Sequence, residues 1–262
     1  MEQHHRESIH RLIELLKRDQ TVLALILSGS LAKGKNRPDS DIDVFIVVTD
    51  EEFERRQSTN DTCYFNSDVC VYPGGYIDGK IVPKRFLERA ALQASEPTKA
   101  SFQGSYVLWS RVNGLQDMIQ KIAAYDDEKR EDKMRSFYAQ VQVWGRFFYR
   151  EGVKKNDTYL IERSVIELVF YASRYILAEN RILFPCHKSM MEMIHSAHNK
   201  PEDYLQLADR LLKEKGTDQV SAFMERFDHY AQCGLSYEQC VSRFMEDSEW
   251  NWINHPPPLQ DC

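Results

Sequence analysis

Two short apolar runs constrain the fold of this chain more than any other feature of its sequence. The first is TVLALIL at residues 21–27, and the second is IDVFIVV at residues 42–48. Each is rich in leucine and β-branched residues, is too short for an ordinary helix, and is bounded by residues that favour turns. That combination is typical of a buried strand, so the early part of the chain is predicted to contain a sheet.

The rest of the first 113 residues alternates between helix and strand patterns. Helical spacing of apolar or charged residues is found in three segments, at about Glu7–Arg18, 51–57 and 84–94. Strand patterns are found in two further segments, 63–82 and 101–110. Within the first of these, Pro73-Gly74-Gly75 indicates a turn between two strands.

Beyond about Asn113 the pattern becomes entirely helical. Seven segments have a 3.6-residue period: 115–125, 127–151, 158–179, 187–198, 201–213, 217–232 and 236–249. The sequence therefore predicts an α+β chain in three parts. These are a mixed β-sheet with flanking helices in residues 1–113, an all-helical bundle domain in residues 114–252, and an irregular tail in residues 253–262.

Composition excludes several kinds of protein. Hydrophobic residues make up 42% of the 262 positions and charged residues 28%, which is the profile of a soluble globular protein. The net charge of −6 disfavours a nucleic acid partner. Because no run of eighteen apolar residues occurs and the N-terminus MEQHHRESIH is polar, neither a membrane span nor a signal peptide is expected. The six cysteines form no C-x-x-C pair, so we expect reduced thiols in a cytoplasmic protein.

Two acids at the start of the second apolar run indicate where the chemistry lies. Asp41 and Asp43 are two positions apart, and such side chains on a strand share one face. Two neighbouring carboxylates repel unless a cation lies between them, and Mg²⁺ prefers oxygen ligands. A structural role in a cap or turn would not need both acids, and an unpaired buried charge is costly.

The first apolar run ends in Gly29-Ser30, which is typical of a phosphate-binding turn. Gly29 lets the backbone approach a ligand closely, and the hydroxyl of Ser30 can donate to a phosphate oxygen. A helix expected at about Leu31–Lys33 would offer backbone N–H groups to the same anion. Lys33 itself is a candidate phosphate contact, with an ordinary solvated lysine as the alternative. A phosphate turn facing an acid pair is the equipment for phosphoryl or nucleotidyl transfer.

The combination of Gly29-Ser30, a spacer of ten residues and Asp41-Ile42-Asp43-Val44 resembles the polymerase-β-type nucleotidyltransferase superfamily. The resemblance covers roughly the first 110 residues. With the helical half that follows, the chain is most similar to the antibiotic nucleotidyltransferases of the aminoglycoside and lincosamide type. The resemblance implies that the aspartate pair binds two Mg²⁺ ions and that a third acid on a later strand completes the site. The acceptor is expected in the cleft between the two halves, with residues 114–252 as the substrate-binding domain.

The third acid is either Asp78, in YIDGKIV, or Asp68, in FNSDVCVY. Asp78 lies between apolar neighbours in the middle of a predicted strand, as the resemblance requires, and is the favoured candidate. Gly79 follows it, however, and an Asp-Gly pair flanked by apolar residues also predicts the centre of a hairpin turn. Metal-binding and catalytic roles are therefore assigned to Asp41, Asp43 and Asp78, with the hairpin left open.

Nucleotide contacts are expected from Gly29, Ser30, Lys33, Ser40 and Lys188. Ser40 follows Pro38-Asp39, so shaping the turn is the alternative role for its side chain. Lys188 follows the helix break ILFPCHK, where the resemblance implies a lysine that faces the nucleotide or the acceptor. An ordinary lysine at a helix start is the alternative.

The expected function is Mg²⁺-dependent transfer of a nucleoside monophosphate, AMP from ATP, to a hydroxyl of a small acceptor such as an aminoglycoside- or lincosamide-like compound. The general base is either Asp78 or a glutamate of the helical region. Two alternatives are nucleotidyl transfer to a protein or tRNA and a catalytically silent nucleotide-binding module. The sequence is compatible with a monomer or a homodimer.

Overall fold

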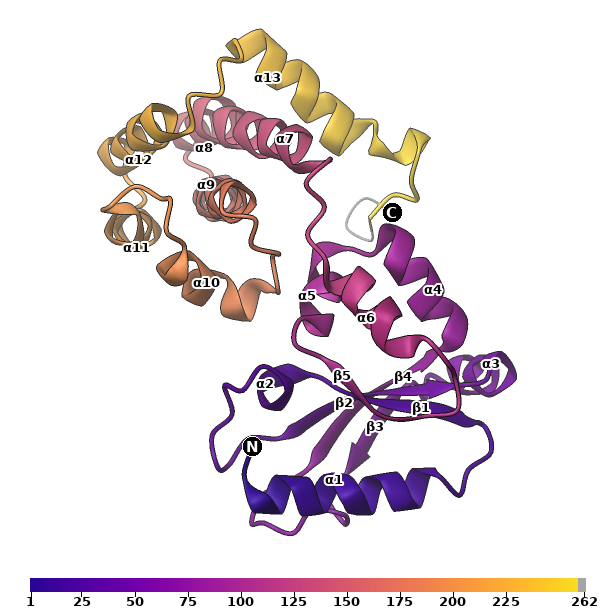
Figure 1. Cartoon of the computed structure of the whole chain (residues 1–262). Helices are drawn as coiled ribbons and strands as arrows, with labels where there is room; N and C mark the ends of the chain where they lie inside the picture. The colour runs from indigo at the N-terminus through magenta and orange to yellow at the C-terminus, as the bar shows by residue number, and fades with distance from the viewer. Residues whose placement is uncertain (259–262) are drawn as a thin grey trace. The chain divides into compact units, whose positions relative to one another are not determined.

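The computed structural model describes residues 1–258, and the chain divides into two compact units, Met1–Ala124 and Tyr125–Cys262 (Figure 1). The first unit contains a β-sheet with helices, and the described residues of the second unit form helices only. The predicted α+β class and the change to helical structure in the second half are confirmed.

A five-stranded sheet with the order β3-β4-β2-β1-β5 forms the centre of the first unit. Strands β2 and β4 are parallel, and the other neighbouring strands are antiparallel. The two apolar runs become inner strands, as their burial requires. The strands are β1 (Val22–Leu27), β2 (Ile42–Val48), β3 (Cys63–Asn66), β4 (Ile77–Pro83) and β5 (Tyr106–Ser110).

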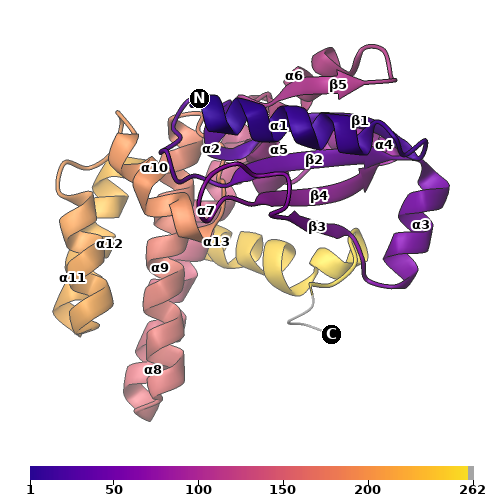
Figure 2. The same ribbon diagram turned by 90° about the horizontal axis from the view of Figure 1, so that it is seen from below.

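Helices cover both faces of this sheet, with α1 on one face and α4, α5 and α6 on the other (Figures 1 and 2). Two of them begin at capping residues that the sequence supplies: Thr49 accepts from the N–H of Glu52, and Ser95 accepts from the N–H of Thr98. The helices of this unit are α1 (Gln3–Leu16), α2 (Gly29–Ala32), α3 (Asp50–Ser58), α4 (Lys84–Gln93), α5 (Glu96–Phe102) and α6 (Leu115–Ala123).

Alternation along β2 separates two hydrophobic cores. Its even-numbered residues pack with Ile9, Leu12 and Leu16 of α1. Phe45 and Val47 lie on the other face, in the core with α4, α5 and α6. Asp43 shares the face of Phe45 and Val47, because it lies two residues before Phe45 on the same strand.

The second unit is a helical bundle in which α9 packs against its neighbours from several sides. Leu168, Ala172 and Ile176 of α9 are fully buried in its core. No helix in the described part of the chain is long and apolar enough to cross a membrane. The helical segments are α7 (Arg130–Val143), η1 (Trp144–Phe148), α8 (Tyr149–Lys155), α9 (Thr158–Glu179), η2 (His187–Ser189), α10 (Met190–Ser196), α11 (Tyr204–Glu214), α12 (Thr217–Ala231), α13 (Tyr237–Phe244), η3 (Met245–Glu249) and η4 (Asn251–Ile253).

Two predicted strand segments are shorter in the structure than in the sequence pattern. The segment 63–82 contains only β3 and β4, because the Asn66 side chain accepts the N–H groups of Asp68 and Val69 and turns the chain. The segment 101–110 contains only β5, since its first two residues end helix α5. The sequence does contain start signals for that helix, namely the N-cap residue Ser95 and Pro97 in its first turn, and the strand pattern alone overlooks them.

Helix α6 lies in the first unit, although the sequence grouped residues from 114 onward with the helical domain. Its residues Leu115, Ile119 and Ile122 pack in the core over the sheet, and periodicity alone does not say which neighbour a helix packs against. The predicted tail at 253–262 starts with the last residue of η4, and residues 259–262, including Cys262, lie outside the described part. Five cysteines of the described residues are free thiols: Cys63, Cys70, Cys186, Cys233 and Cys240.

Candidate metal centre

Three carboxylates come together where β2 and β4 begin. The parallel register pairs Asp43 with Asp78, and Asp41 precedes β2 by one residue. One carboxylate oxygen of each acid lies within 4.8 Å of the others, so the group could hold a metal ion. Oxygen ligands this close suit a hard divalent cation.

The structure places the two candidates for the third acid in different environments. Asp78 is the second residue of β4, and the strand continues through Gly79, so Asp78-Gly79 is not a hairpin turn. Asp68 lies in the turn that follows β3, outside the acid cluster. The favoured candidate, Asp78, is therefore the acid that neighbours the predicted pair.

Burial and the neighbouring acids make the ionised form of Asp43 electrostatically costly without a cation. The pKa of Asp43 is raised to about 6, chiefly because the carboxyl is buried and then because Asp41 and Asp78 are nearby. Lys80 and Lys33 lower the pKa of Asp43, but they offset only part of that effect. A bound divalent cation would favour the ionised form of Asp43.

Gly29 is required by the position of Asp43. Its φ angle is +65°, and a Cβ atom added there would lie 1.8 Å from Oδ2 of Asp43. The neighbouring N–H of Ser28 donates to the backbone oxygen of Asp43 at 2.9 Å. Glycine at this position therefore lets the first turn of α2 pack directly against a carboxylate of the cluster.

The other predicted residues of the turn lie at the same end of the sheet. Ser30 is the second residue of α2, a single turn that begins at Gly29, two residues before the expected start at Leu31. Lys33 ends that turn, and its Nζ donates to the backbone oxygen of Ala100 at 3.3 Å. Lys33 is close enough to Asp43 to lower the pKa of its carboxyl, so its charge reaches the acid cluster.

Side chains from α1 and from the turn before β4 hold the loop that leads into Asp41. We call His4, His5 and Tyr72 together the clamp. Ser40 is buried, and its backbone oxygen accepts from Tyr72 Oη at 2.8 Å and from His5 Nε2 at 3.2 Å. His4 Nε2 donates in the same way to the backbone oxygen of Pro38 at 2.9 Å. Burial, followed by the neighbouring His4, lowers the pKa of His5, which favours the neutral ring.

The side chain of Ser40 is also engaged within this loop. Its Oγ accepts from the backbone N–H of Arg37 at 2.9 Å. The turn-shaping role considered for Ser40 is therefore present in the structure, and its contact with a nucleotide stays a prediction.

Two residues beside the acids were missed in the sequence. Tyr76 Oη donates to Oδ2 of Asp41 at 3.0 Å. Lys80 lies two residues after Asp78 on β4, and so on the same face, with Nζ 5.6 Å from the centre of the Phe45 ring. The two-residue period could have identified Lys80, whereas the Tyr76 contact joins residues 35 positions apart.

Lys188 lies in the second unit, exposed in the short helix η2. No acid of the cluster belongs to that unit. A contact between Lys188 and the nucleotide stays a prediction.

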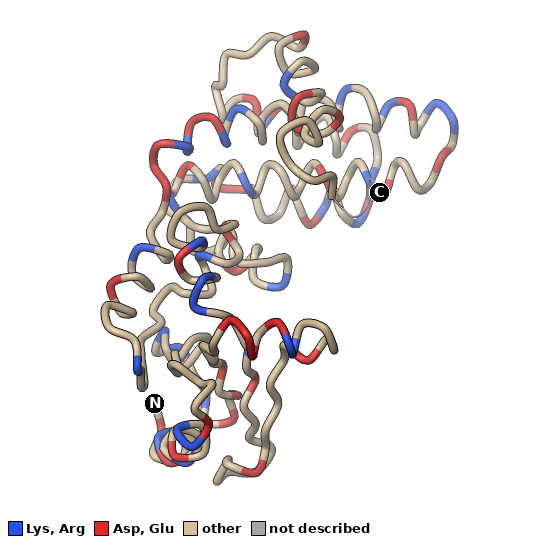
Figure 3. Tube along the Cα trace, turned by 90° about the vertical axis from the view of Figure 1, so that its right-hand side faces the viewer, with Lys and Arg blue, Asp and Glu red and all other residues tan. Residues whose placement is uncertain are grey.

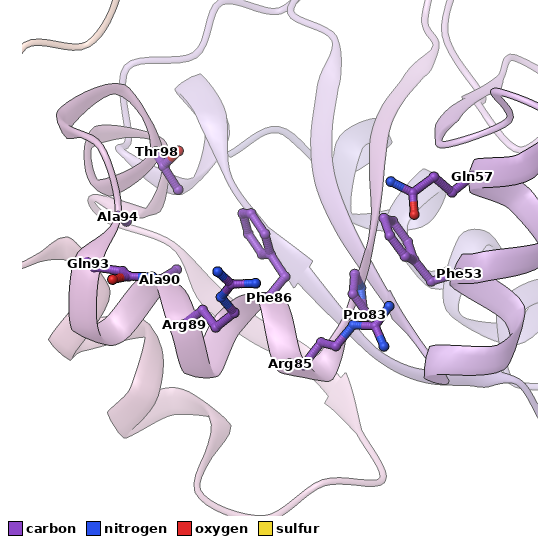
Figure 4. Close-up of a pocket in the computed structure, with 10 residues that line it drawn as sticks. All are labelled: Phe53, Gln57, Pro83, Arg85, Phe86, Arg89, Ala90, Gln93, Ala94 and Thr98. Carbon is purple, nitrogen blue, oxygen red and sulfur yellow. The ribbon is translucent and has the colours of Figure 1, made fainter. Parts of the chain in front are cut away.

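A separate cavity of about 370 Å³ occurs in the first unit, lined by residues of α3, α4 and α5 and by Pro83 at the end of β4 (Figure 4). Phe53 and Phe86 form its apolar walls, and Arg85 and Arg89 lie at its rim. Asp78 and Pro83 are at opposite ends of β4, roughly 17 Å apart at 3.3 Å per residue. The cavity is therefore not part of the acid cluster.

One family model matches part of the first unit. Residues 9–93 match the family model described as "Nucleotidyltransferase domain", and this segment contains all three acids. A solved structure of a nucleotidyltransferase-like protein from Exiguobacterium sibiricum aligns over 98% of this chain and 83% of its own, with 10% identity and a TM-score of 0.47. No curated protein matches the chain.

Proposed function

From the nucleotidyltransferase domain at residues 9–93, we propose that this protein transfers AMP from ATP to a hydroxyl group of a small molecule in a Mg²⁺-dependent reaction. Generic nucleotidyl transfer follows from the domain match. The observation that supports the metal dependence is the cluster of Asp41, Asp43 and Asp78 inside the matched segment.

The residues of the cluster fit the needs of this reaction. Three ionised carboxylates would hold two Mg²⁺ ions, which when bound lower the pKa of an acceptor hydroxyl and neutralise charge on the triphosphate. Gly29 and Ser30 lie beside the cluster in α2, where we place the β- and γ-phosphates. Lys33 and Lys80 bring positive charge to the same end of the sheet. In nucleotidyl transfer such positioning and charge neutralisation supply most of the catalysis.

The acceptor is proposed to be a small molecule of the aminoglycoside or lincosamide type. Lys and Arg alternate with Asp and Glu along the described helices of both units, and the net charge of −6 is acidic (Figure 3). A nucleic acid acceptor would favour a concentrated basic surface. Charge thus supports a small acceptor over tRNA, and the preference for this antibiotic class rests on resemblance alone.

A catalytically silent binding module is the second candidate. It would bind a nucleotide without turnover. The presence of all three acids in one cluster favours an active enzyme over this candidate.

Calorimetric titration with α,β-methylene ATP tests the proposal. Binding by the wild type should require Mg²⁺, and Asp41→Asn should remove the Mg²⁺ requirement together with most of the affinity. Asp39→Asn is the matched control, because Asp39 is an exposed acid two residues away that pairs with Arg37. Binding that ignores both Mg²⁺ and Asp41 would refute the metal-dependent function.

Turnover separates the two candidates. Incubation of the wild type with ATP labelled at the α-phosphate, Mg²⁺ and kanamycin or lincomycin should give labelled acceptor and unlabelled pyrophosphate. Mg²⁺-dependent binding with no pyrophosphate release, with these or any other hydroxylated acceptors, would favour the silent module.

A further inference from the structure

An exposed aromatic residue lies beside the acid cluster. Phe65, on the edge strand β3, is 71% exposed. Its ring is stacked on that of Tyr76, with 5.3 Å between the ring centres and 29° between the planes. Tyr76 in turn donates its hydroxyl hydrogen to Asp41. We call Phe65 and Tyr76 together the aromatic surface.

Strand register fixes the aromatic surface next to the acids. Asp78 of β4 is paired with Asp43 of β2 on one side and with Phe65 of β3 on the other. Directly paired residues project from the same face of a sheet, with Cβ atoms roughly 5 Å apart. Asp43, Asp78 and Phe65 therefore form a row across three strands, with the phenyl ring at its open end.

Folding does not account for the exposure of this ring. The preceding residue of β3, Tyr64, points to the opposite face and packs against the core under α1. Phe65 belongs to none of the hydrophobic cores of the described residues. Single exposed apolar residues are common. Phe65 differs from them because it is in register with one acid and stacked on the tyrosine that holds another.

The order of the sheet, together with the phosphate position in the proposed function, indicates which reactant would lie near the aromatic surface. Helix α2, where the proposed function places the β- and γ-phosphates, packs against β2, whereas β3 lies beyond β4 on the far side of the acids. In-line transfer requires the attacking oxygen and the leaving pyrophosphate on opposite sides of the phosphorus. With the leaving group on the α2 side, the attacking hydroxyl enters from the β3 side.

We propose that the aromatic surface of Phe65 and Tyr76 binds a ring of the acceptor and thereby directs its hydroxyl to Asp78. The substrate class is a hydroxylated compound with a flat apolar or aromatic ring face close to the reactive hydroxyl. Aromatic rings stack on such faces with specific geometry. This inference rests on the proposed function, because that function defines which side of the cluster the acceptor occupies.

The test uses the full chain saturated with Mg²⁺ and α,β-methylene ATP, and two probes that differ in one ring. Phenyl β-D-glucoside and methyl β-D-glucoside are each titrated, and binding is followed by ligand-observed NMR. The wild type should bind the phenyl compound roughly three- to tenfold more tightly, as expected for one aromatic contact. Phe65→Ala should abolish this preference, and Phe65→Trp should keep it.

Leu92→Ala is the matched control, since Leu92 is 83% exposed on α4 and its loss removes a similar exposed apolar side chain away from the acids. It should keep the phenyl preference. Equal binding of both glucosides by the wild type, or a preference that survives Phe65→Ala, would overturn the inference. A preference seen only without nucleotide would also overturn it, because the nucleotide itself would then cover the ring. Failure of the wild type to bind Mg²⁺ and nucleotide would instead count against the proposed function.

Discussion

The two ends of β2 and β4 share one face of the sheet but have opposite environments. At one end, Val47 and Val82 are buried beneath α4, α5 and α6. At the other end, Asp43 and Asp78 occupy the equivalent paired positions, and Asp78 is exposed. Helices α4, α5 and α6 thus cover this face at the C-terminal ends of β2 and β4 but not at the N-terminal ends, where the acids lie.

Within this pair of strands, one end therefore contributes to the stability of the fold, and the other carries the candidate metal ligands. Burial at the apolar end contributes free energy of folding, about 25 cal/mol for each Å² of apolar surface removed from water. The acids at the other end bury no apolar surface on this face, and the pKa of Asp43 is raised there by burial and by the neighbouring carboxylates. Substitutions at the two ends should therefore have different consequences, and the following predictions test that separation.

The largest effect is expected at the acid end, from Asp78→Asn. The substitution keeps the shape of the side chain and removes one ligand charge, so transfer should fall about 10³-fold while the unfolding temperature stays the same or rises. Pyrophosphate release and thermal unfolding measure the two quantities. Asp68→Asn, in the turn after β3, is the control and should be mild; the reverse order would make Asp68 the third acid.

Truncation at the apolar end should do the opposite. Leu87 of α4 is fully buried in the core that contains Val47 and Val82. Leu87→Ala should lower the free energy of unfolding by about 3 kcal/mol through lost burial and the cavity left behind. Urea unfolding measures this loss. Affinity for Mg²⁺ and α,β-methylene ATP, measured well below the unfolding transition, should not change, and a large loss there would contradict the separation of the two ends.

Gly29→Ala tests whether the acid end depends on close packing. The added Cβ would meet Oδ2 of Asp43, so the carboxylate must shift. A displacement of about 1 Å at a catalytic group can cost about 10²-fold in rate. The matched control is Gly34→Ala, where φ is +67° and nothing lies within 4 Å of the added atom. Both variants carry the same backbone strain, so equal rates would show that the contact with Asp43 is unimportant.

Local patterns predicted much of this comparison. The β-branched runs and the two-residue period predicted β2, the shared face of the acid pair and its place at the strand start. The choice between Asp78 in a strand and Asp78 in a hairpin was not decided locally, because pairing of β4 with β2 across 35 positions settles it. The contacts of Tyr72 and His5 with Ser40 also span more than 30 positions, and no local period contains them.

Unpaired charge at the acid end should make the stability of the metal-free protein depend on pH. The pKa of Asp43 is about 6 in the folded state and 3.8 in the reference state, so the folded state binds more protons between these values. Stability should therefore fall as pH rises from about 4 to 6. Because Asp43 is partly exposed, solvent screening reduces the expected loss to about 1 kcal/mol.

Urea unfolding at pH 4.5, 5.5 and 7 measures this loss, with EDTA or with excess Mg²⁺. Added Mg²⁺ should stabilise the protein more at pH 7 than at pH 4.5, because the ion binds the ionised carboxylates. Asp43→Asn should flatten the dependence in EDTA. A loss of the same size in that variant would assign the titration to another group.

The smallest effect is expected from the clamp on the loop before Asp41. Tyr72→Phe removes the hydroxyl that donates to the Ser40 backbone oxygen and leaves the ring in place. His5 still donates to the same oxygen, so the loop should loosen rather than unfold. One neutral hydrogen bond contributes about 1 kcal/mol, so affinity for Mg²⁺ should fall roughly three- to tenfold.

Tyr64→Phe makes the same chemical change outside the clamp, since the Tyr64 hydroxyl accepts from the Asn66 side chain and not from the loop before Asp41 in the described structure. Calorimetric titration of Mg²⁺ in the presence of α,β-methylene ATP compares the two variants with the wild type. Weaker Mg²⁺ binding in Tyr72→Phe alone would show that Tyr72, in the turn before β4, helps to position the first metal ligand. Equal affinities would mean that the Tyr72 hydroxyl does not help to position Asp41, and that β2 and the His5 contact suffice.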